Sequence, residues 1–236
     1  MVKAPSTVIG WVRDSSGCFR EVVLGEMRPF NEIPRRMKFK QEDDLDAANR
    51  GMNLWLDPIP SCLRADAIAD FEAGDAVGFL SKAGNHDGLD LVSMNLHLLK
   101  ARGIYEAALL HAFTSTRLNN IRCSMAGLKF LFTTADRQRL LAAGHPLPGP
   151  GPFTIYRGVA GRALDRRVRG FSWTASSEQA AWFARRSAKF GLVDPAVYEA
   201  TVDHSAVLAY SNDRKEQEFI VMLPPTVRTR RIEVAS

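Results

Sequence analysis

The chain of 236 residues has few cysteines, no long apolar run and no low-complexity tract. Its three cysteines, Cys18, Cys62 and Cys123, are odd in number and widely spaced, which argues against a disulfide framework and against a Cys-x-x-Cys metal site. No apolar run approaches the roughly 18 residues that a membrane helix requires. We therefore expect no membrane partner and no structural metal.

Several functional patterns are missing as well. The histidines lack the spacing of metal ligands, and neither a phosphate-binding P-loop nor a nucleophile elbow occurs. The segment Met1–Gly10 lacks the basic, apolar and small-residue succession of a secretory signal. These absences predict a cytoplasmic protein whose chemistry does not use a metal ion.

Hydrophobic residues make up 46% of the chain, which is ample for a buried core, and the formal net charge is +5. From Gly151 onward, 13 basic residues stand against 9 acidic ones, a net charge of +4, so the first 150 residues carry +1. This distribution favours an anionic ligand or partner for the C-terminal part, although a charge of this size is also common on proteins that bind no anion.

A segment rich in proline and glycine, His145–Pro152, forbids both helix and central strand and is the clearest boundary in the sequence. We expect a mainly helical N-terminal region over 1–145, a connection over 146–152 and a C-terminal domain over 153–236. The N-terminal region begins with a β-hairpin around the turn Asp14–Gly17 and is helical from about Gly88 to Ala143.

Apolar periodicity and capping residues give the expected elements more closely. A hydroxyl N-cap at Thr133 or Thr134 begins the last helix before the boundary, which ends at Gly144. After the boundary we expect a helix over 177–190 and short strands over 153–157, 170–174, 196–202, 206–210, 218–223 and 227–234. The fold class is therefore α+β.

Three short motifs of the C-terminal part carry chemistry, and the first is Tyr156-Arg157-Gly158. Arg157 ends a strand-like run, and its planar fork of N–H donors suits a diphosphate. The alternative is a surface arginine on an edge strand. A lone arginine of this kind does not distinguish the two.

The second and third motifs are Ser172-Trp173-Thr174 and Glu216-Gln217-Glu218. Ser172 and Thr174 are two apart on a strand and so share a face, as do Glu216 and Glu218. Paired carboxylates beside a buried strand indicate a site, because like charges raise the energy unless a cation or polarised ligand is near. The alternatives are helix capping near Ser172 and a solvated strand start at Glu216.

In this order, the three motifs resemble the R-S-E class of ADP-ribosyltransferases, which use NAD as substrate. The resemblance covers about Phe153 to Val234 and implies a split β-sandwich for this domain. It implies that Arg157, with Gly158, binds the NAD phosphates and ribose, and that Ser172 holds the glutamate and the nicotinamide ribose. Thr174 is the second hydroxyl of that strand. Glu218 is the catalytic carboxylate, and Glu216 contacts the acceptor.

The helix after the Ser motif also resembles the family, through the pattern Ala180-Ala-Trp-Phe-Ala184. Phe183 is then a candidate to stack on nicotinamide, while Trp182 is expected to pack the helix onto the sheet. Two departures stand out. Only fourteen residues separate Arg157 from Ser172, and Trp173 lies inside the Ser motif, where it points to the opposite face.

The short connection holds four arginines, Arg162, Arg166, Arg167 and Arg169, which either approach the NAD phosphates or a nucleic-acid acceptor or form a solvated surface. The resemblance implies a mono-ADP-ribosyltransferase that modifies a protein arginine, such as a bacterial or phage effector in the host cytosol. Water or a nucleic acid as acceptor, and a protein that binds NAD or nucleic acid without turnover, stay open. So does an antitoxin or immunity partner.

Overall fold

The computed structural model describes residues 7–13, 19–26, 54–84, 87–115, 123–162, 166–189 and 191–233. Internal contacts divide the chain into two compact units, Met1–Leu45 and Asp46–Ser236. The first unit contains strands β1 (Thr7–Arg13) and β2 (Phe19–Glu26), which pair antiparallel. This confirms the hairpin expected from the turn-forming residues between them.

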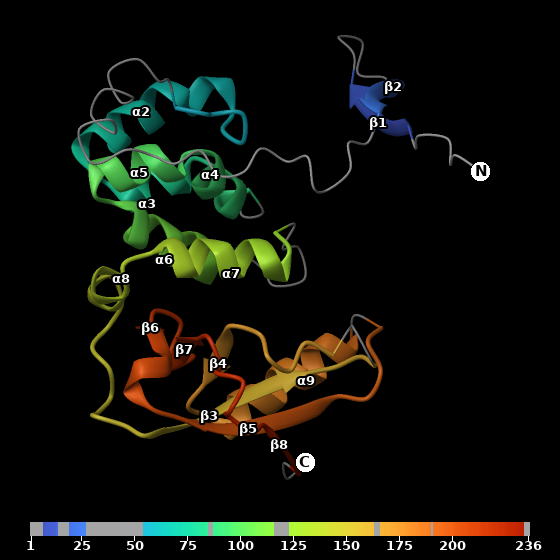
Figure 1. Ribbon diagram of the computed structural model, residues 1–236, viewed down its shortest axis with the longest axis vertical. Coiled ribbons are helices and arrows are strands. Elements are labelled where there is room, and N and C mark those ends of the chain that lie inside the picture. The colour runs from blue at the N-terminus through green and yellow to red at the C-terminus, as the bar shows by residue number, and fades with distance from the viewer. Residues whose placement is uncertain are drawn as a thin grey trace. The chain divides into compact units, whose positions relative to one another are not determined.

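The second unit is α+β, as expected (Figure 1). Its described residues form a six-stranded antiparallel open sheet in the order β6-β7-β4-β3-β5-β8. The strands are β3 (Phe153–Val159), β4 (Ser172–Thr174), β5 (Ala196–Val202), β6 (Val207–Ser211), β7 (Glu218–Val221) and β8 (Arg230–Ile232). The helices are α2 (Arg64–Ala73), α3 (Ala76–Ser81), α4 (Gly88–Met94), α5 (Leu96–Arg102), α6 (Tyr105–Ser115), α7 (Met125–Thr134), α8 (Arg137–Ala143) and α9 (Ser177–Lys189).

Local sequence explains where several of these helices begin or end. Gly74 and Gly103 take the left-handed conformation that closes α2 and α5, with φ of 78° and 80°. The side chain of Asp136, rather than Thr133 or Thr134, caps the N-terminus of α8 by accepting a hydrogen bond from the Arg139 amide at 2.9 Å. The predicted hydroxyl cap is therefore wrong, because α7 continues through both threonines.

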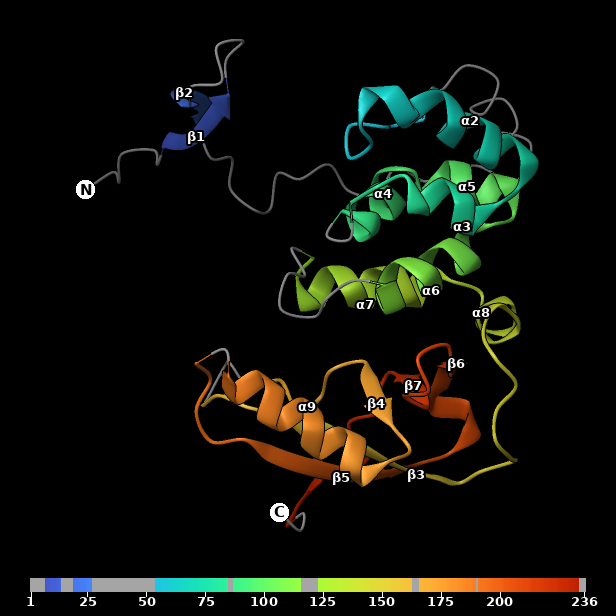
Figure 2. The same cartoon turned by 180° about the vertical axis from the view of Figure 1, so that it is seen from behind.

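Helices α2 to α8 bury one continuous apolar core that also includes residues of the sheet. Leu109 and Leu131 are almost fully buried in it, together with Ile220 of β7 and Phe171 next to β4. The ring of Phe171 stacks on Phe132 of α7 at a centroid distance of 4.9 Å. Figures 1 and 2 show the helices stacked on one side of the sheet, with α8 beside β6. Helices and sheet therefore belong to one compact unit.

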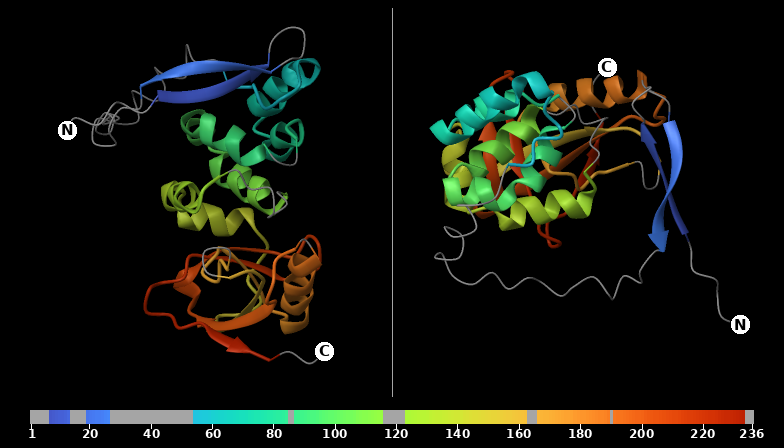
Figure 3. Two further views of the ribbon diagram at one scale, coloured as in Figure 1. Left: turned by 90° about the vertical axis from the view of Figure 1, so that its right-hand side faces the viewer. Right: turned by 90° about the horizontal axis from the view of Figure 1, so that it is seen from above.

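The two faces of the sheet are covered differently. Trp173 and Phe219 lie on one face, in a core that the sheet builds mainly from its own strands. On the opposite face, α9 lies along β3 and β5 and buries Ala180 and Ala184 against Val197 (Figure 3). Within the described ranges, no helix combines the length and apolar character that crossing a bilayer would require.

Gly158 allows α9 to approach β3 closely. A Cβ atom at this position would lie 1.7 Å from the Ala180 carbonyl oxygen and 2.7 Å from the Ala184 amide nitrogen, both of them backbone atoms of α9. Backbone atoms cannot swing aside as the end of a flexible side chain can. The absence of a side chain at Gly158 is therefore a packing requirement, whatever part the residue has in binding a ligand.

Substitution Gly158→Ala should destabilise the chain by about 1 to 3 kcal/mol, because α9 must move away from the sheet to admit the methyl group. Urea unfolding followed by circular dichroism measures the loss. Gly149→Ala is the matched control, since a Cβ at Gly149 has no atom within 4 Å. Equal stability of the two variants would contradict the proposed close approach.

Candidate functional site

Strands β4 and β7 bring the Ser and Glu motifs together. Thr174 pairs with Glu218 and Ser172 pairs with Ile220, so alternation along the strands puts these four side chains on one face of the sheet. The Ser172 hydroxyl donates a hydrogen bond to Glu218 Oε1 at 2.5 Å. Trp173 points to the opposite face, as its position between the two hydroxyl residues predicts, and is 1% exposed.

The Glu218 carboxyl group is buried at the start of β7. Burial raises its pKa above the ordinary value, since removal from water disfavours the charged form, and nearby Glu216 acts in the same direction. The hydrogen bond from Ser172 and the positive charges of Arg214 and Arg157 lower the pKa and offset part of that effect. Glu218 is therefore a carboxyl group that holds its proton more tightly than an exposed one, at the centre of a cluster of charged groups.

Arg157 of β3 reaches the same cluster. Its guanidinium donates from Nη1 to the Ser172 carbonyl oxygen and from Nε to the Arg167 carbonyl oxygen, the latter at 3.0 Å. Strands β3 and β4 share only the registered pair Tyr156 and Thr174, so this side chain bridges the two strands where backbone pairing is sparse. Desolvation lowers the pKa of Arg157 to about 10, while the charge of Glu218 raises it. The guanidinium therefore stays protonated at neutral pH.

Gly170 makes room for that guanidinium. A Cβ at Gly170 would lie 2.3 Å from Arg157 Nη2 and 2.6 Å from Cζ. Among the residues that the structure describes, Nη2 has no hydrogen-bond acceptor, whereas Nε and Nη1 are bound to carbonyl oxygens. The arginine is thus fixed in place by two of its nitrogens and retains donors for a further acceptor.

The turn before β7 has an unusual backbone that presents Glu216. Lys215 and Gln217 both adopt left-handed conformations, with φ of 55° and 48°, which non-glycine residues rarely take. The Thr174 hydroxyl donates to the Glu216 carbonyl oxygen at 2.7 Å, and Asn212 Oδ1 accepts from the Gln217 amide at 3.2 Å. Thr174 therefore holds this turn with its hydroxyl, and the turn, rather than strand alternation, directs Glu216.

Arg214 joins the two acidic residues of the third motif. One of its guanidinium nitrogens, Nη2, lies 3.1 Å from Glu216 Oε2 and 3.9 Å from Glu218 Oε2. The Arg214 side chain is 54% exposed, whereas those of Glu216 and Glu218 are 20% and 11% exposed. Arg214 was not identified as a site residue from the sequence. Its position two and four residues before the glutamates is the signal that could have indicated a contact with them.

Helix α9 carries the remaining candidate, Phe183. Its ring is half-buried and meets Trp182 edge-on at a centroid distance of 5.1 Å. Trp182 is 45% exposed and lies against the Arg186 guanidinium, so the expectation that it packs the helix onto the sheet is wrong. The small residues of α9 make that contact instead. Stacking of Phe183 on nicotinamide stays a prediction.

The arginines between β3 and β4 are partly tied to the protein itself. Arg166 forms an ion pair with Asp194 and donates to the Gly161 carbonyl oxygen. Arg169 donates to the carbonyl oxygens of Leu223, Pro224 and Val227. Arg162 and Arg167 are exposed. Arg166 and Arg169 therefore serve the fold, and the role that was considered for a basic loop is left to Arg162 and Arg167.

Two hollows of the second unit lie elsewhere. One cavity, of about 330 Å³, is bordered by His145, Ser211 and Asp213 near the end of β6. The other, of about 190 Å³, lies among the helices beside His111. Neither is lined by Arg157, Ser172 or Glu218, and in the described residues no group of three or more His, Cys, Asp or Glu side chains is arranged to hold a metal ion. The candidate site is therefore identified by the chemistry of its side chains and not by either of these two cavities.

The raised pKa of Glu218 predicts how the free energy of unfolding depends on pH. Because the folded chain holds this proton more tightly than the unfolded chain, the proton's contribution to stability is present below the ordinary carboxyl pKa and is lost as pH rises through the raised value. Glu218→Gln stays neutral throughout. Its free energy of unfolding should therefore increase relative to the wild type as pH rises, by at most about 1.4 kcal/mol per pH unit.

Urea unfolding across pH 4 to 8 measures this difference, and Glu72→Gln, at an exposed position of α2, is the control. A difference between Glu218→Gln and the wild type that does not change with pH would contradict the raised pKa.

Comparison with known proteins leaves the family open: no protein-family model matches the chain, and neither a curated protein nor a solved structure does. Function is therefore inferred from the geometry of the three motifs.

Proposed function

We propose that the chain is a mono-ADP-ribosyltransferase that uses NAD and modifies an arginine of a protein target. One observation carries the proposal: Arg157, Ser172 and Glu218 come from three different strands and meet in one hydrogen-bonded and electrostatically coupled group. Their order along the chain is the order of the three motifs in the family that the sequence resembles, and their grouping in space supports the proposal. The antiparallel sheet, with its sparse pairing between β3 and β4, is compatible with the split β-sandwich of this class.

The donor set suits the charge of NAD. Arg157 is cationic at neutral pH, is fixed by two carbonyl oxygens and retains N–H donors for an acceptor, which is what binding a diphosphate requires. Gly170 keeps the space beside Nη2 free of a side chain. The net positive charge of the C-terminal part also favours binding of an anionic ligand such as NAD.

NAD supplies the bond between nicotinamide and ribose, whose cleavage develops positive charge on the ribose. The Glu218 carboxylate stabilises that charge, and its burial away from water strengthens the attraction. Ser172 fixes the carboxylate through its hydroxyl, and Arg157 lies close enough to influence its ionisation. Glu216, which is less buried, positions the acceptor and receives its proton.

The charges of the site also bear on which acceptor the enzyme modifies. The two neighbouring carboxyl groups of Glu216 and Glu218, of which Glu216 is the less buried, favour a cationic guanidinium as acceptor. A nucleic-acid acceptor is less favoured, because Arg166 and Arg169 of the basic segment are engaged within the fold. A cytoplasmic effector of phage or bacterial origin, with a protein target, fits this chemistry.

Removing the catalytic charge tests the proposal. Glu218→Gln keeps the size and the acceptor oxygen for Ser172 but removes the negative charge, so nicotinamide release from NAD should fall roughly 100- to 1,000-fold. Glu216→Gln should lose transfer to agmatine, a small guanidino acceptor, while retaining nicotinamide release to water. Labelled NAD and chromatography of nicotinamide measure both steps.

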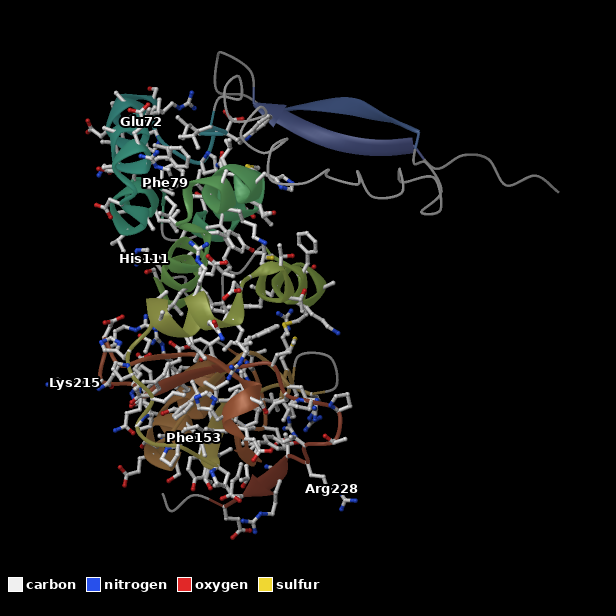
Figure 4. The ribbon with its side chains drawn as sticks, turned by 60° about the vertical axis from the view of Figure 1, so that its left-hand side comes forward. Glu72, Phe79, His111, Phe153, Lys215 and Arg228 are labelled. Carbon is white, nitrogen blue, oxygen red and sulfur yellow. The ribbon has the colours of Figure 1, made fainter. Side chains whose placement is uncertain are left out.

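Glu72→Gln is the matched control for these two variants, since Glu72 is exposed on α2 and lies far along the second unit from Lys215 of the turn before β7 (Figure 4). The proposal fails if the wild-type chain neither releases nicotinamide nor labels agmatine or protein. Release without any transfer would leave a glycohydrolase in its place.

Binding of NAD can be tested apart from turnover. Arg157→Lys keeps the charge but loses the fork of donors, so the dissociation constant for NAD should rise roughly tenfold to a hundredfold. Isothermal titration with the Glu218→Gln background prevents consumption of NAD during the measurement. Arg228→Lys, an exposed change on the segment before β8, should leave the constant unchanged. Equal affinity for both variants would remove Arg157 from the binding site.

A further inference from the structure

The proposed function does not use Arg214, although its guanidinium belongs to the cluster around Glu218. Its guanidinium lies 3.1 Å from Glu216 and 3.9 Å from Glu218, so a single Nη2 atom stands within reach of both carboxylates. An arginine acceptor must present its guanidinium nitrogen at the same place, between the carboxylate that receives its proton and the carboxylate that stabilises the ribose. The chain therefore presents a guanidinium of its own where the acceptor is needed.

The turn that carries Arg214 is built to hold it there. The Lys215 amide donates to the Asn212 carbonyl oxygen at 3.0 Å and closes the turn, and the Gln217 amide is bound by the Asn212 side chain. The Asn212 amide in turn donates to Nδ1 of His145 at 3.3 Å. Left-handed conformations at Lys215 and Gln217 fold the chain back, so that the Arg214 side chain lies over the glutamates that follow it.

We propose that Arg214 is an acceptor of the enzyme's own reaction, so that the chain ADP-ribosylates itself at this residue. The inference rests on the proposed function and goes beyond it by naming the modified side chain. NAD is the co-reactant. The bond between the ribose C1 atom and nicotinamide breaks, and its electron pair leaves with nicotinamide. A new bond forms between that C1 atom and an Nη atom of Arg214, whose proton passes to Glu216.

Two features distinguish self-modification from a purely structural ion pair. The Arg214 side chain is 54% exposed, so the ADP-ribosyl product can extend into solvent. Its guanidinium also lies 3.9 Å from the Glu218 carboxylate, so the attached ADP-ribosyl group would stand directly beside that carboxylate. The modified side chain would occupy the acceptor position, and the modified enzyme should transfer ADP-ribose to other guanidines more slowly.

The experiment incubates the purified full chain with labelled NAD, measures incorporation by intact mass and locates the label by peptide mass spectrometry. The wild type should gain one ADP-ribose on the peptide containing Arg214, at a rate per molecule that does not change when the protein is diluted. Arg214→Lys keeps a positive charge beside Glu216 but removes the guanidinium, so this label should be lost completely. Arg228→Lys, on the exposed segment before β8, should be labelled as the wild type is.

Labelling of agmatine distinguishes a failure of self-modification from a failure of the proposed function. If agmatine is modified by the wild type but the Arg214 peptide is not, self-modification is overturned and the proposed function stands. If neither agmatine nor any peptide is labelled and no nicotinamide is released, both are overturned. Label that persists in Arg214→Lys at an unchanged level also overturns the inference, because the acceptor is then another residue.

Discussion

A carboxylate removed from water must be balanced by donors and positive charge, and the sheet half of this protein is organised around that requirement at Glu218. Ser172 supplies a hydroxyl donor from the neighbouring strand, and Arg157 and Arg214 supply positive charge from β3 and from the preceding turn. These groups do not fully offset the cost of burial, because the pKa of Glu218 stays raised. Such incomplete compensation is typical of a functional carboxyl group, whereas a purely structural one is usually paired until its charged form is favoured.

The same requirement explains the backbone around the carboxylate. Glu216 lies between two residues in the left-handed conformation, Lys215 and Gln217, and each of these conformations costs of order 1 kcal/mol or more. Hydrogen bonds from Thr174 and Asn212 hold this arrangement. A regular strand would continue the alternation of β7 backward and separate Arg214 from Glu218. The strained turn instead brings the guanidinium of Arg214 and both glutamates into one cluster.

Much of the fold could be predicted from the sequence, because its elements are separated by strong local signals. The strands of the C-terminal part are short β-rich runs after the proline- and glycine-rich boundary, and α9 was expected over 177–190 and is found at Ser177–Lys189. Helices α2 and α3 were not assigned, because their apolar spacing is weak. The motif residues were identified by order alone, yet the bonds of Arg157 to two carbonyl oxygens and the pairing of Arg214 depend on how distant strands meet. Local patterns do not encode such side-chain contacts. For the same reason, the exposure of Trp182 could not be predicted from the sequence.

The helical layer, for which the sequence offered no role, supports the site mechanically. Phe171 immediately precedes Ser172, and its ring stacks on Phe132 of α7, so the start of β4 is anchored in the core of the helices. On the other side, His145 follows α8 and accepts the amide hydrogen of Asn212, the residue that braces the turn before β7. Both motifs that position Glu218 are thus fixed from the same layer. Since interiors are close-packed and transmit small displacements, a shift of α7 or α8 must move Ser172 and the acidic turn relative to each other. The helices therefore help to set the geometry of the cluster around Glu218, even though helices α2 to α8 contribute no described side chain to it.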